Sequence, residues 1–295
     1  MTTHRAAAMM LVAMTAAATS AALIKSVALD VPVFQLLFLR FFLVALVLIP
    51  FTNWTEIRAQ KPFVPHHAVR TVLVILGLFS YFWALRTTPL SSAVSVFYAY
   101  PAITLVLAWA ILGARIQGRT IAAVLVSFAG VLMVLQPDLR NGNLEILLVL
   151  VTAICVASRA IFDRVLAVRN ASPVTVLMIS SLMASLLLVV PGVVDFARLS
   201  VSMAAILVAI AALGALTQLL VIAVLGQGHW GTFAVFGYWE VLISVPLAFG
   251  FFGEVPGLLA AIGMALIVVG GLLREKPAPA SVLRDVPARR PAYAS

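Results

Sequence analysis

The sequence predicts an all-α integral membrane protein whose ten transmembrane helices form a 5+5 inverted repeat around a central cavity. Hydrophobic residues make up 64% of the 295 residues and charged residues only 10%, and the mean hydropathy is +1.16. A soluble domain with this composition would lack a surface that interacts with water, so lipid is the expected solvent. Apolar runs of membrane-spanning length, about 20 residues each, recur along the chain and repeat at an offset of about 140 residues.

Short connections join most of the predicted spans. The exception is the segment 51–70, which carries two prolines and the pair His66–His67. We expect residues 1–140 to form the first five-helix repeat, residues 141–273 the second, and residues 274–295 a disordered cytoplasmic tail. In chain order, the spans are Ala6–Ala28, Pro32–Pro50, Thr71–Thr87, Ser91–Leu112, Thr120–Leu135, Leu144–Leu166, Pro173–Val190, Val201–Leu225, Thr232–Phe252 and Pro256–Leu273.

The first span has an alternative interpretation. Arg5, the apolar run after it and the small residues 18–22 also resemble a secretory signal with its cleavage site. Cleavage would remove the first span and destroy the pairing of the two halves. We therefore expect this segment to remain in the protein as a transmembrane helix.

The distribution of positive charge predicts the orientation in the membrane. With the N-terminus in the cytoplasm, thirteen Lys and Arg residues lie on the cytoplasmic side and four on the outer side, namely Lys25, Arg86, Arg140 and Arg198. This bias explains the net charge of +9 better than nucleic-acid binding does, because no basic stripe interleaved with aromatic residues is present. Both termini are expected on the cytoplasmic side of a bacterial cytoplasmic (inner) membrane.

The odd number of helices in each half predicts the inversion. The second set of five must enter the bilayer from the side opposite to the first. Such a repeat places a binding site where the halves meet near the membrane midplane, and it lets one half rock against the other, as secondary transporters do. An offset of 140 residues pairs Tyr98 with Tyr238, Gly113 with Gly253, Gly130 with Gly270 and Pro137 with Pro277.

Six short segments and one arginine carry a family resemblance. They are 84–101 (ALRTTPLSSAVSVFYAYP), 112–113 (LG), 130–137 (GVLMVLQP), 252–256 (FGEVP), 262–263 (IG), 270–271 (GG) and Arg40. Together they resemble the EamA-type members of the drug/metabolite transporter superfamily, over nearly the whole chain except the tail. One departure is that the Gly-Glu pair usual in both halves of the family is Gly113–Ala114 in the first half. If that glutamate supports the loop or gates a mouth of the cavity, the role here rests on Glu254 alone.

The resemblance implies a ten-helix bundle whose cavity is lined mainly by the third, fourth, eighth and ninth spans. It also implies transport of small metabolites, among them amino acids, drugs and vitamins or nucleotide-like compounds. YddG-type exporters of aromatic amino acids are one group in this family, and no motif here singles them out. From the resemblance alone, we expect export of amino acids or related metabolites by a monomer or homodimer, with import of a vitamin or nucleotide-like metabolite as the alternative.

Glu240 is the sharpest candidate for a site residue, because an ionised side chain at mid-span costs at least about 2.5 kcal/mol unless it is paired or hydrated. It is expected to face the bundle interior as a proton carrier or as the partner of a substrate ammonium. The structural alternatives are a pair with an arginine or a carboxyl kept protonated by burial. Arg40, near the middle of its span, is expected to bind a substrate carboxylate, to neutralise Glu240 or to form another fixed ion pair.

Arg159 lies closer to the cytoplasmic end of its span and is followed four residues later by Asp163. Residues at this spacing share a helix face. We expect the two side chains to pair with each other and to extend towards the cytoplasm, in a structural role.

Aromatic residues gather in the fourth and ninth spans: Phe97, Tyr98 and Tyr100 in one, and Phe236 and Tyr238 in the other. Such walls suit an amphipathic or aromatic solute, although single aromatics more often pack or face lipid. Tyr238 and Glu240 are about 200° apart around a helix, so both cannot point into one cavity. We favour inward positions for Glu240 and its repeat mate Tyr100. Tyr98 and Tyr238 would then pack against neighbouring helices, and the opposite arrangement exchanges the two sets.

Pro101 and Pro246 fall within these same two spans. Each predicts a bend, because proline lacks a backbone donor and frees a carbonyl at depth. Bends in related helices, together with Glu254 after the ninth span, suit a gating or coupling element. Ser80 and Trp83 in the third span and Gln218 in the eighth are the remaining candidates for the cavity wall, although small hydroxyls often bond only to their own helix.

Several sites are missing from the sequence. It contains no Gly-Lys-Ser/Thr phosphate loop for ATP and no aspartate-rich pair for Mg²⁺ and diphosphate, and His66–His67 have no further ligands nearby for a metal. The single cysteine, Cys155, lies in an apolar run and is expected to pack. We predict a secondary transporter of a small organic solute, without a cofactor, in which Glu240 couples to protons or engages a cationic group of the solute. The alternatives are a membrane enzyme acting on a lipid-linked substrate and a passive facilitator.

Overall fold

The computed structural model describes residues 3–100, 143–168, 171–194, 196–226 and 239–273, and between them 103, 107, 118, 122, 125–126, 128–134 and 237. All regular elements within these residues are helices. Five of the described helices are long and apolar enough to cross a membrane: His4–Val27, Val33–Phe51, Lys61–Ala84, Pro173–Val194 and Val201–Val224. Shorter apolar helices cover Ile146–Ala160, Trp239–Phe252 and Leu258–Gly270. The predicted all-helical, multi-pass membrane architecture is confirmed.

The first half begins with two long apolar helices and a short polar one. Its helices are α1 (Thr3–Val27), α2 (Val33–Leu48), α3 (Trp54–Ala59), α4 (Val64–Ala84) and α5 (Leu90–Phe97), with 3₁₀ turns at Ile49–Phe51 and Lys61–Phe63. Asn53 begins α3, because its Oδ1 accepts hydrogen bonds from the backbone N–H groups of Thr55 (3.1 Å) and Glu56 (3.3 Å). The described residues 122, 125–126 and 128–134 are helical and fall in the predicted fifth span.

The second half repeats this order without the short polar helix. Its described helices are α8 (Ile146–Val168), α9 (Pro173–Val194), α10 (Val201–Gly226), α12 (Trp239–Phe252) and α13 (Leu258–Leu273). Ser172 and Ser200 stand before α9 and α10, and their hydroxyl oxygens accept from the backbone N–H groups of Thr175 (3.3 Å) and Met203 (3.2 Å). Both helices therefore start at serine caps followed by an apolar run, a signal that the local sequence carries.

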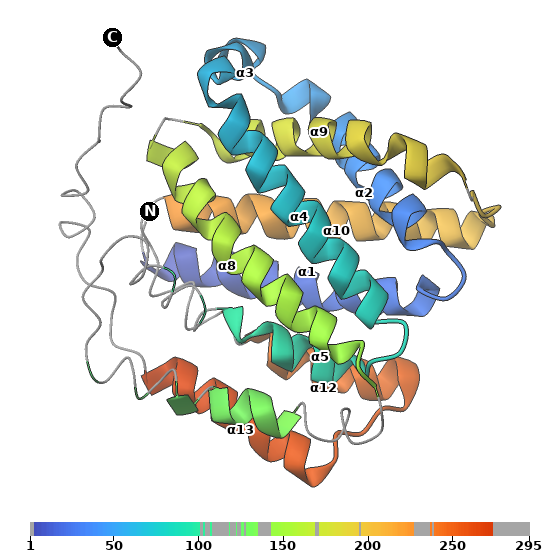
Figure 1. Cartoon of the computed structure of the whole chain (residues 1–295), viewed down its shortest axis with the longest axis vertical. Helices are drawn as coiled ribbons and strands as arrows, with labels where there is room; N and C mark the ends of the chain where they lie inside the picture. Colours follow the sequence, from blue (N-terminus) through green and yellow to red (C-terminus); the bar gives the residue numbers. More distant parts are fainter. Residues whose placement is uncertain are drawn as a thin grey trace.

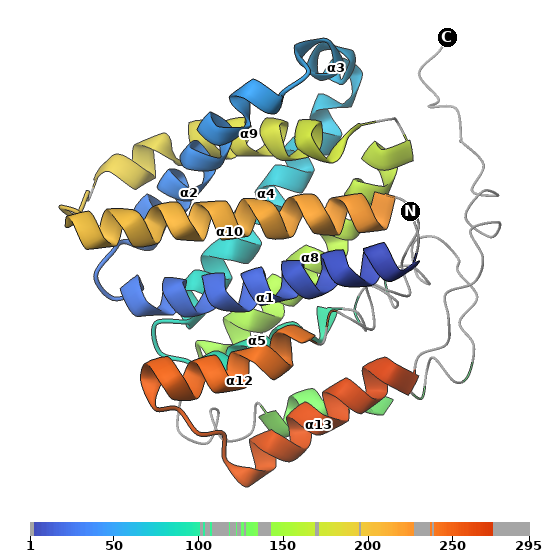
Figure 2. The same ribbon diagram turned by 180° about the vertical axis from the view of Figure 1, so that it is seen from behind.

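The helices of the two halves interlock (Figures 1 and 2). The contact between α1 and α10 has a counterpart in the contact between α4 and α8, since α1 corresponds to α8 and α4 to α10. The contacts α2–α9 and α5–α12 each join a helix to its own counterpart. Counterparts such as α4 and α10 run in opposite directions across Figure 1. This exchange of contacts is what a two-fold inverted repeat requires.

Helix α4 starts earlier than the sequence predicts. The predicted span was Thr71–Thr87, with 51–70 as a long connection, whereas the helix runs over Val64–Ala84. Pro65 lies in its first turn, where the missing N–H removes no helical hydrogen bond. His67 and Arg70 are fully buried, so the prediction that Arg70 belongs to a cytoplasmic loop is wrong. Hydropathy treats arginine as solvent-exposed even where the fold supplies a buried partner, as Asp163 is for Arg70.

The fourth span was predicted as one helix bent at Pro101, and the structure interrupts it a few residues earlier. α5 ends at Phe97, Tyr98 and Ala99 form a turn, and helical geometry resumes at Tyr100. Pro101 lies outside the described residues, but a proline there has no N–H to donate to the carbonyl of Phe97, which explains a break just before it. In the ninth span, α12 contains Pro246 within its helical length.

Two glycines bring the fifth span against α13. A Cβ atom on Gly130 would lie 2.5 Å from the carbonyl oxygen of Gly263, and one on Gly263 would lie 2.6 Å from that of Gly130. Membrane helices associate through such close backbone approaches, because lipid provides no hydrophobic driving force between them. This contact joins the last helix of the first half to the last helix of the second.

Candidate functional site: a cavity between the two halves

A cavity of about 190 Å³ lies among α1, α2, α4, α5, α8, α10 and α12. Its charged lining residues are Arg40, Arg159 and Glu240, and its tyrosines are Tyr81, Tyr98 and Tyr100. Both halves contribute to the wall, as expected of a site at the interface of inverted repeats. The family resemblance implied a cavity of the third, fourth, eighth and ninth spans, and the structure adds the first, second and sixth.

Glu240, at the start of α12, is buried with 6% of its surface exposed. The hydroxyl of Tyr98 donates a hydrogen bond to Glu240 Oε2 at 2.8 Å. This bond crosses from one half of the molecule to the other and holds the carboxyl at the cavity wall. The structure therefore places Glu240 in the bundle interior, where an acidic side chain in a membrane protein is expected to have a functional or structural partner.

Four aromatic side chains form one wall beside Glu240. Phe97 contacts Tyr81, Tyr98 and Tyr100 with ring centroids 5.9, 5.4 and 5.1 Å apart. The interruption after α5 lets Tyr98 and Tyr100 both line the cavity, so the expectation that Tyr98 packs outside it is wrong. The buried hydroxyl of Tyr81 has no hydrogen-bond partner among the described residues.

Arg40 reaches the cavity from α2, and 9% of its surface is exposed. Its guanidinium carbon lies over the ring of Phe82, 5.6 Å from the ring centroid. No ion pair or hydrogen bond joins its side chain to any residue that the structure describes. The expected neutralisation of Glu240 by Arg40 is therefore not observed.

Arg159, the second cavity arginine, has both a neutral and an acidic partner. Its Nη1 donates to Gln218 Oε1 at 2.8 Å, and its Nε lies 3.4 Å from Asp163 Oδ2. The predicted Arg159–Asp163 pair is present. Gln218 also lines the cavity, so the amide links this arginine to the α10 side of the wall.

Arg70 and Asp163 form a buried ion pair that the sequence did not predict. Arg70 Nε donates to Asp163 Oδ1 at 2.5 Å, and Arg70 Nη1 donates to the hydroxyl of Ser180 at 2.5 Å. The side chains of Arg70 and Asp163 are 1% and 9% exposed. These contacts link α4, α8 and α9 across the two halves. The only sequence signal for this pair was Asp163, an acid within an apolar span. Its partner Arg70 lies 93 residues away in the sequence.

Several predicted residues do not line the cavity. Ser80 is buried in α4 but lies outside the cavity wall. Trp83 is 40% exposed, with Phe79 beside it and the Arg86 guanidinium over its ring, so its assignment to the cavity is wrong. One helical turn separates Ser80 and Trp83, and the residues of this stretch that line the cavity are Tyr81 and Phe82. Pro246 lies in α12 away from the wall, and Phe236, Tyr238 and Pro101 lie outside the described residues.

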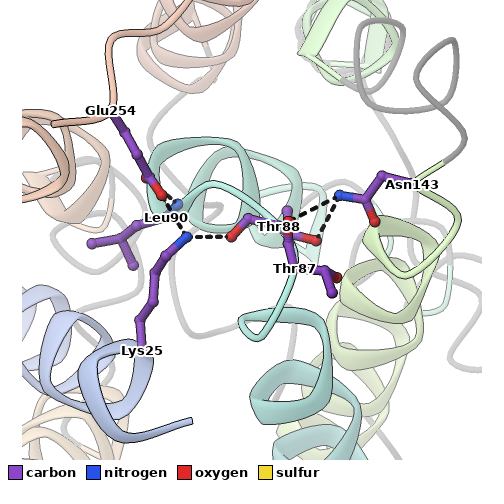
Figure 3. Close-up of polar contacts among 6 residues, drawn as sticks. All are labelled: Lys25, Thr87, Thr88, Leu90, Asn143 and Glu254. Carbon is purple, nitrogen blue, oxygen red and sulfur yellow. Dashed lines mark hydrogen bonds and ion pairs between the residues drawn. The ribbon is translucent and has the colours of Figure 1, made fainter. Parts of the chain in front are cut away.

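Glu254 lies at one end of the bundle, in a network that joins both halves (Figure 3). Its Oε1 lies 2.5 Å from Lys25 Nζ, and its Oε2 accepts from the backbone N–H of Leu90 at 2.8 Å. Lys25 also donates to the carbonyl of Thr88 at 2.6 Å. Gly253, with φ of +65°, ends α12 in the left-handed region that glycine adopts without strain, and it turns the chain towards this contact. We call Lys25, Glu254 and the backbone of Thr88 and Leu90 the Lys25–Glu254 latch.

Comparison with known proteins agrees with this architecture. An S-adenosylmethionine uptake transporter of Rickettsia prowazekii (strain Madrid E) is 26% identical over 238 residues, covering 80% of this chain and 80% of the relative. The transporter of the same name from Rickettsia bellii (strain RML369-C) is 25% identical over 238 residues, covering 80% and 81%. A solved crystal structure matches 92% of this chain and 96% of its own with a TM-score of 0.63 at 20% identity, which shows the shared fold. Residues 4–136 and 143–273 each match the EamA-like transporter family, and the chain belongs to that family.

Proposed function

We propose that this protein takes up S-adenosylmethionine, or a metabolite of the same chemical class, across the cytoplasmic membrane by alternating access. The name of the Rickettsia relatives supports the substrate. The observation in the structure that carries the proposal is the cavity between the halves, where a buried carboxylate, two arginines and an aromatic wall converge. The family membership supports transport in preference to the enzymatic alternative.

The cavity suits a solute that combines an aromatic ring with positive charge. S-adenosylmethionine carries a sulfonium cation, an ammonium group and an adenine ring. A cation over the face of a tyrosine gains about 0.5–2 kcal/mol, and adenine can stack on the same kind of ring. Glu240 offers the opposite charge beside Tyr98 and Tyr100. A few charged groups set in an aromatic wall are the usual way in which a small-molecule site fixes orientation.

The direction of transport is proposed from the relatives. The sequence resemblance alone favoured export of amino acids, with import of a nucleotide-like metabolite as the alternative. The relatives are named for uptake, which supports the alternative. We propose that Glu240 either pairs with the cationic solute or exchanges a proton during the cycle.

The Lys25–Glu254 latch suits the outer gate of such a cycle. With both termini in the cytoplasm, as the positive charges predict, the latch lies on the outer side of the membrane. Its ion pair ties α1 to the end of α12, and breaking it would release these helices from each other. The first half has Ala114 where the second has Glu254, so this position offers no equivalent ion pair on the cytoplasmic side.

Flux in liposomes tests the proposal. Purified protein reconstituted into vesicles is expected to take up radiolabelled S-adenosylmethionine saturably, to show counterflow against unlabelled compound, and to leave the compound chemically intact. A panel of amino acids and nucleosides serves as competitors. Uptake equal to that of protein-free vesicles would refute the substrate, and conversion of the compound would favour the enzymatic alternative.

A further inference from the structure

Arg40 stands apart from the other buried and half-buried cations in the part of the chain that the structure describes. Arg70 is paired with Asp163, Arg159 lies near Asp163 and donates to Gln218, and Lys25 is paired with Glu254. Within the described part of the chain, Arg40 has no acid within ion-pair distance and no hydrogen-bond acceptor. A charged side chain inside a membrane is normally paired or hydrated, because an isolated charge there is costly.

The guanidinium of Arg40 is held in a defined position despite lacking an anion. Its carbon lies 5.6 Å from the centroid of the Phe82 ring. The guanidinium also packs against Gly214 of α10, where an added Cβ would overlap its Nη2 and Cζ atoms. Because glycine has no side chain, Gly214 leaves a recess for the guanidinium that the Cβ atom of any other residue would fill. The recess is built from α2 in the first half and α10 in the second.

This recess opens on the solute cavity. Arg40, Gly214 and Phe82 all belong to the cavity wall. A guanidinium presents a planar fork of N–H donors that matches a carboxylate in bidentate geometry. Glu240 lines the same cavity without an ion pair to Arg40, so the two groups do not neutralise each other. A zwitterionic solute can then use both.

We propose that Arg40, seated against Gly214 and Phe82, is the subsite for the carboxylate of the transported metabolite. The inference rests on the proposed function, because it assigns one end of that same solute. It specifies an α-amino acid or another carboxylate-bearing compound and excludes amines that lack the carboxylate as good substrates. Arg159 is a weaker candidate for this role, since Asp163 lies 3.4 Å from its Nε as a counter-ion and Gln218 accepts a hydrogen bond from its Nη1.

A pair of ligands that differ only in the carboxylate tests the subsite. Equilibrium binding of S-adenosylmethionine and of its decarboxylated analogue is measured on purified wild-type protein and on Arg40→Gln. The wild type is expected to prefer the carboxylate-bearing ligand by about 10- to 100-fold, the range of a hydrogen-bonded charge. Arg40→Gln is expected to lose this preference while binding the decarboxylated analogue within about threefold of the wild type, a change of under 1 kcal/mol.

Two further variants separate a binding role from a structural one. Gly214→Ala keeps the charge but displaces the guanidinium, so it is expected to lower the preference in the same selective way. Arg86→Gln is the matched control, because this arginine stacks on Trp83 outside the cavity wall and its loss is expected to leave the preference intact. Retained binding of the decarboxylated analogue shows that each variant is folded. Equal loss of both ligands in Arg40→Gln, or an unchanged preference, would overturn the subsite.

The subsite and the proposed function can fail separately. Phenylalanine and phenethylamine form a second pair with the same single difference. A wild type that ignores S-adenosylmethionine but prefers phenylalanine through Arg40 would refute the proposed substrate and support the subsite. A wild type that binds S-adenosylmethionine and its decarboxylated analogue equally would support the substrate class and overturn the subsite.

Discussion

Within the described residues, Glu240 is the single carboxylate in the cavity wall, and its environment is well defined. Tyr98 donates to one of its oxygens, and the arginines of the wall form no ion pair with it. The group is therefore available to a cationic solute or to a proton. The two roles predict different effects on flux when the Glu240 side chain carries no charge.

Replacement of Glu240 by Gln tests both roles. We expect solute uptake to fall at least about tenfold, since an amide neither carries a charge nor exchanges a proton. Loss of counterflow and net uptake together indicates a solute ligand, whereas retained counterflow with loss of pH-gradient-driven uptake indicates a proton carrier. Ser244→Ala, one turn further along α12 and outside the cavity wall, is the matched control. Normal, equally pH-dependent uptake in Glu240→Gln would remove this residue from the mechanism.

Asp163 has a role in stability. Asp163→Asn leaves the buried Arg70 and Arg159 guanidinium groups without their anion, a change that typically costs about 3–5 kcal/mol. We expect a clear decrease in the unfolding midpoint of the detergent-solubilised protein, followed by its intrinsic fluorescence. Ser180→Ala removes only one hydrogen bond to Arg70, worth about 1.5–3 kcal/mol, so its decrease is expected to be smaller. Equal midpoints in the wild type and Asp163→Asn would contradict this role.

Individual residues were only partly predictable from the sequence. An acid in the middle of an apolar span is tolerated only away from lipid, so the sequence assigned Glu240 to the bundle interior. Trp83 could not be placed, because an aromatic ring is stable both against lipid and in a cavity. The Arg70–Asp163 pair depends on how α4 and α8 are rotated against each other, which hydropathy does not report.

At the scale of elements, the Lys25–Glu254 latch connects α1, the start of α5 and the end of α12. The side chains of Lys25 and Glu254 are 14% and 21% exposed, so the ion pair is partly hydrated. Fully exposed pairs contribute about 0.2–1 kcal/mol, and water still screens this half-buried pair, so we expect a contribution on the order of 1 kcal/mol. A contribution of this size suits a gate, because it biases two conformations without locking either one.

The cavity contains a residue that can report on the proposed gate. Cys155, the single cysteine of the chain, lines the cavity and is 4% exposed. Lys25→Met is expected to speed labelling of Cys155 by a membrane-impermeant thiol reagent added outside, by about two- to fivefold. The charge swap of Lys25→Glu with Glu254→Lys keeps opposite charges but loses the bonds to Thr88 and Leu90, so it is expected to restore slow labelling only in part.

Arg86→Met provides the control for this experiment. Arg86 is another cation of the predicted outer side, and it stacks on Trp83 outside the latch. Its loss is expected to leave the labelling rate unchanged. Labelling as slow in Lys25→Met as in the wild type would show that the latch does not close the outer side.

At the scale of the whole molecule, the inverted repeat explains why the cavity lies where it does. The contacts α1–α10 and α4–α8 exchange under the two-fold relation. All four of these helices contribute residues to the cavity wall. The relation requires an odd number of spans in each half. It therefore also requires that the two ends of the ten-span chain lie on the same side of the membrane.

The location of the termini tests this arrangement directly. A fluorescent protein that does not fold after export through the general secretory pathway reports a cytoplasmic location. Its fusions are expected to fluoresce at both the N- and the C-terminus. A periplasmic phosphatase fused at either end is expected to be inactive. Opposite results at the two ends would be incompatible with ten spans, whatever the substrate.

The sequence alone determined the solvent, the order of the spans and the two-fold repeat, because these follow from the amount and spacing of apolar residues. It also determined that Glu240 and Arg40 lie in the interior, since lipid tolerates neither charge. Only the tertiary structure decided which charges are paired: Arg159 and Arg70 share Asp163, whereas Arg40 is seated against Gly214 and Phe82 without an anion. Pairing depends on the rotation and close approach of helices far apart in the chain, which the apolar pattern of a nearly uniformly hydrophobic helix leaves undetermined.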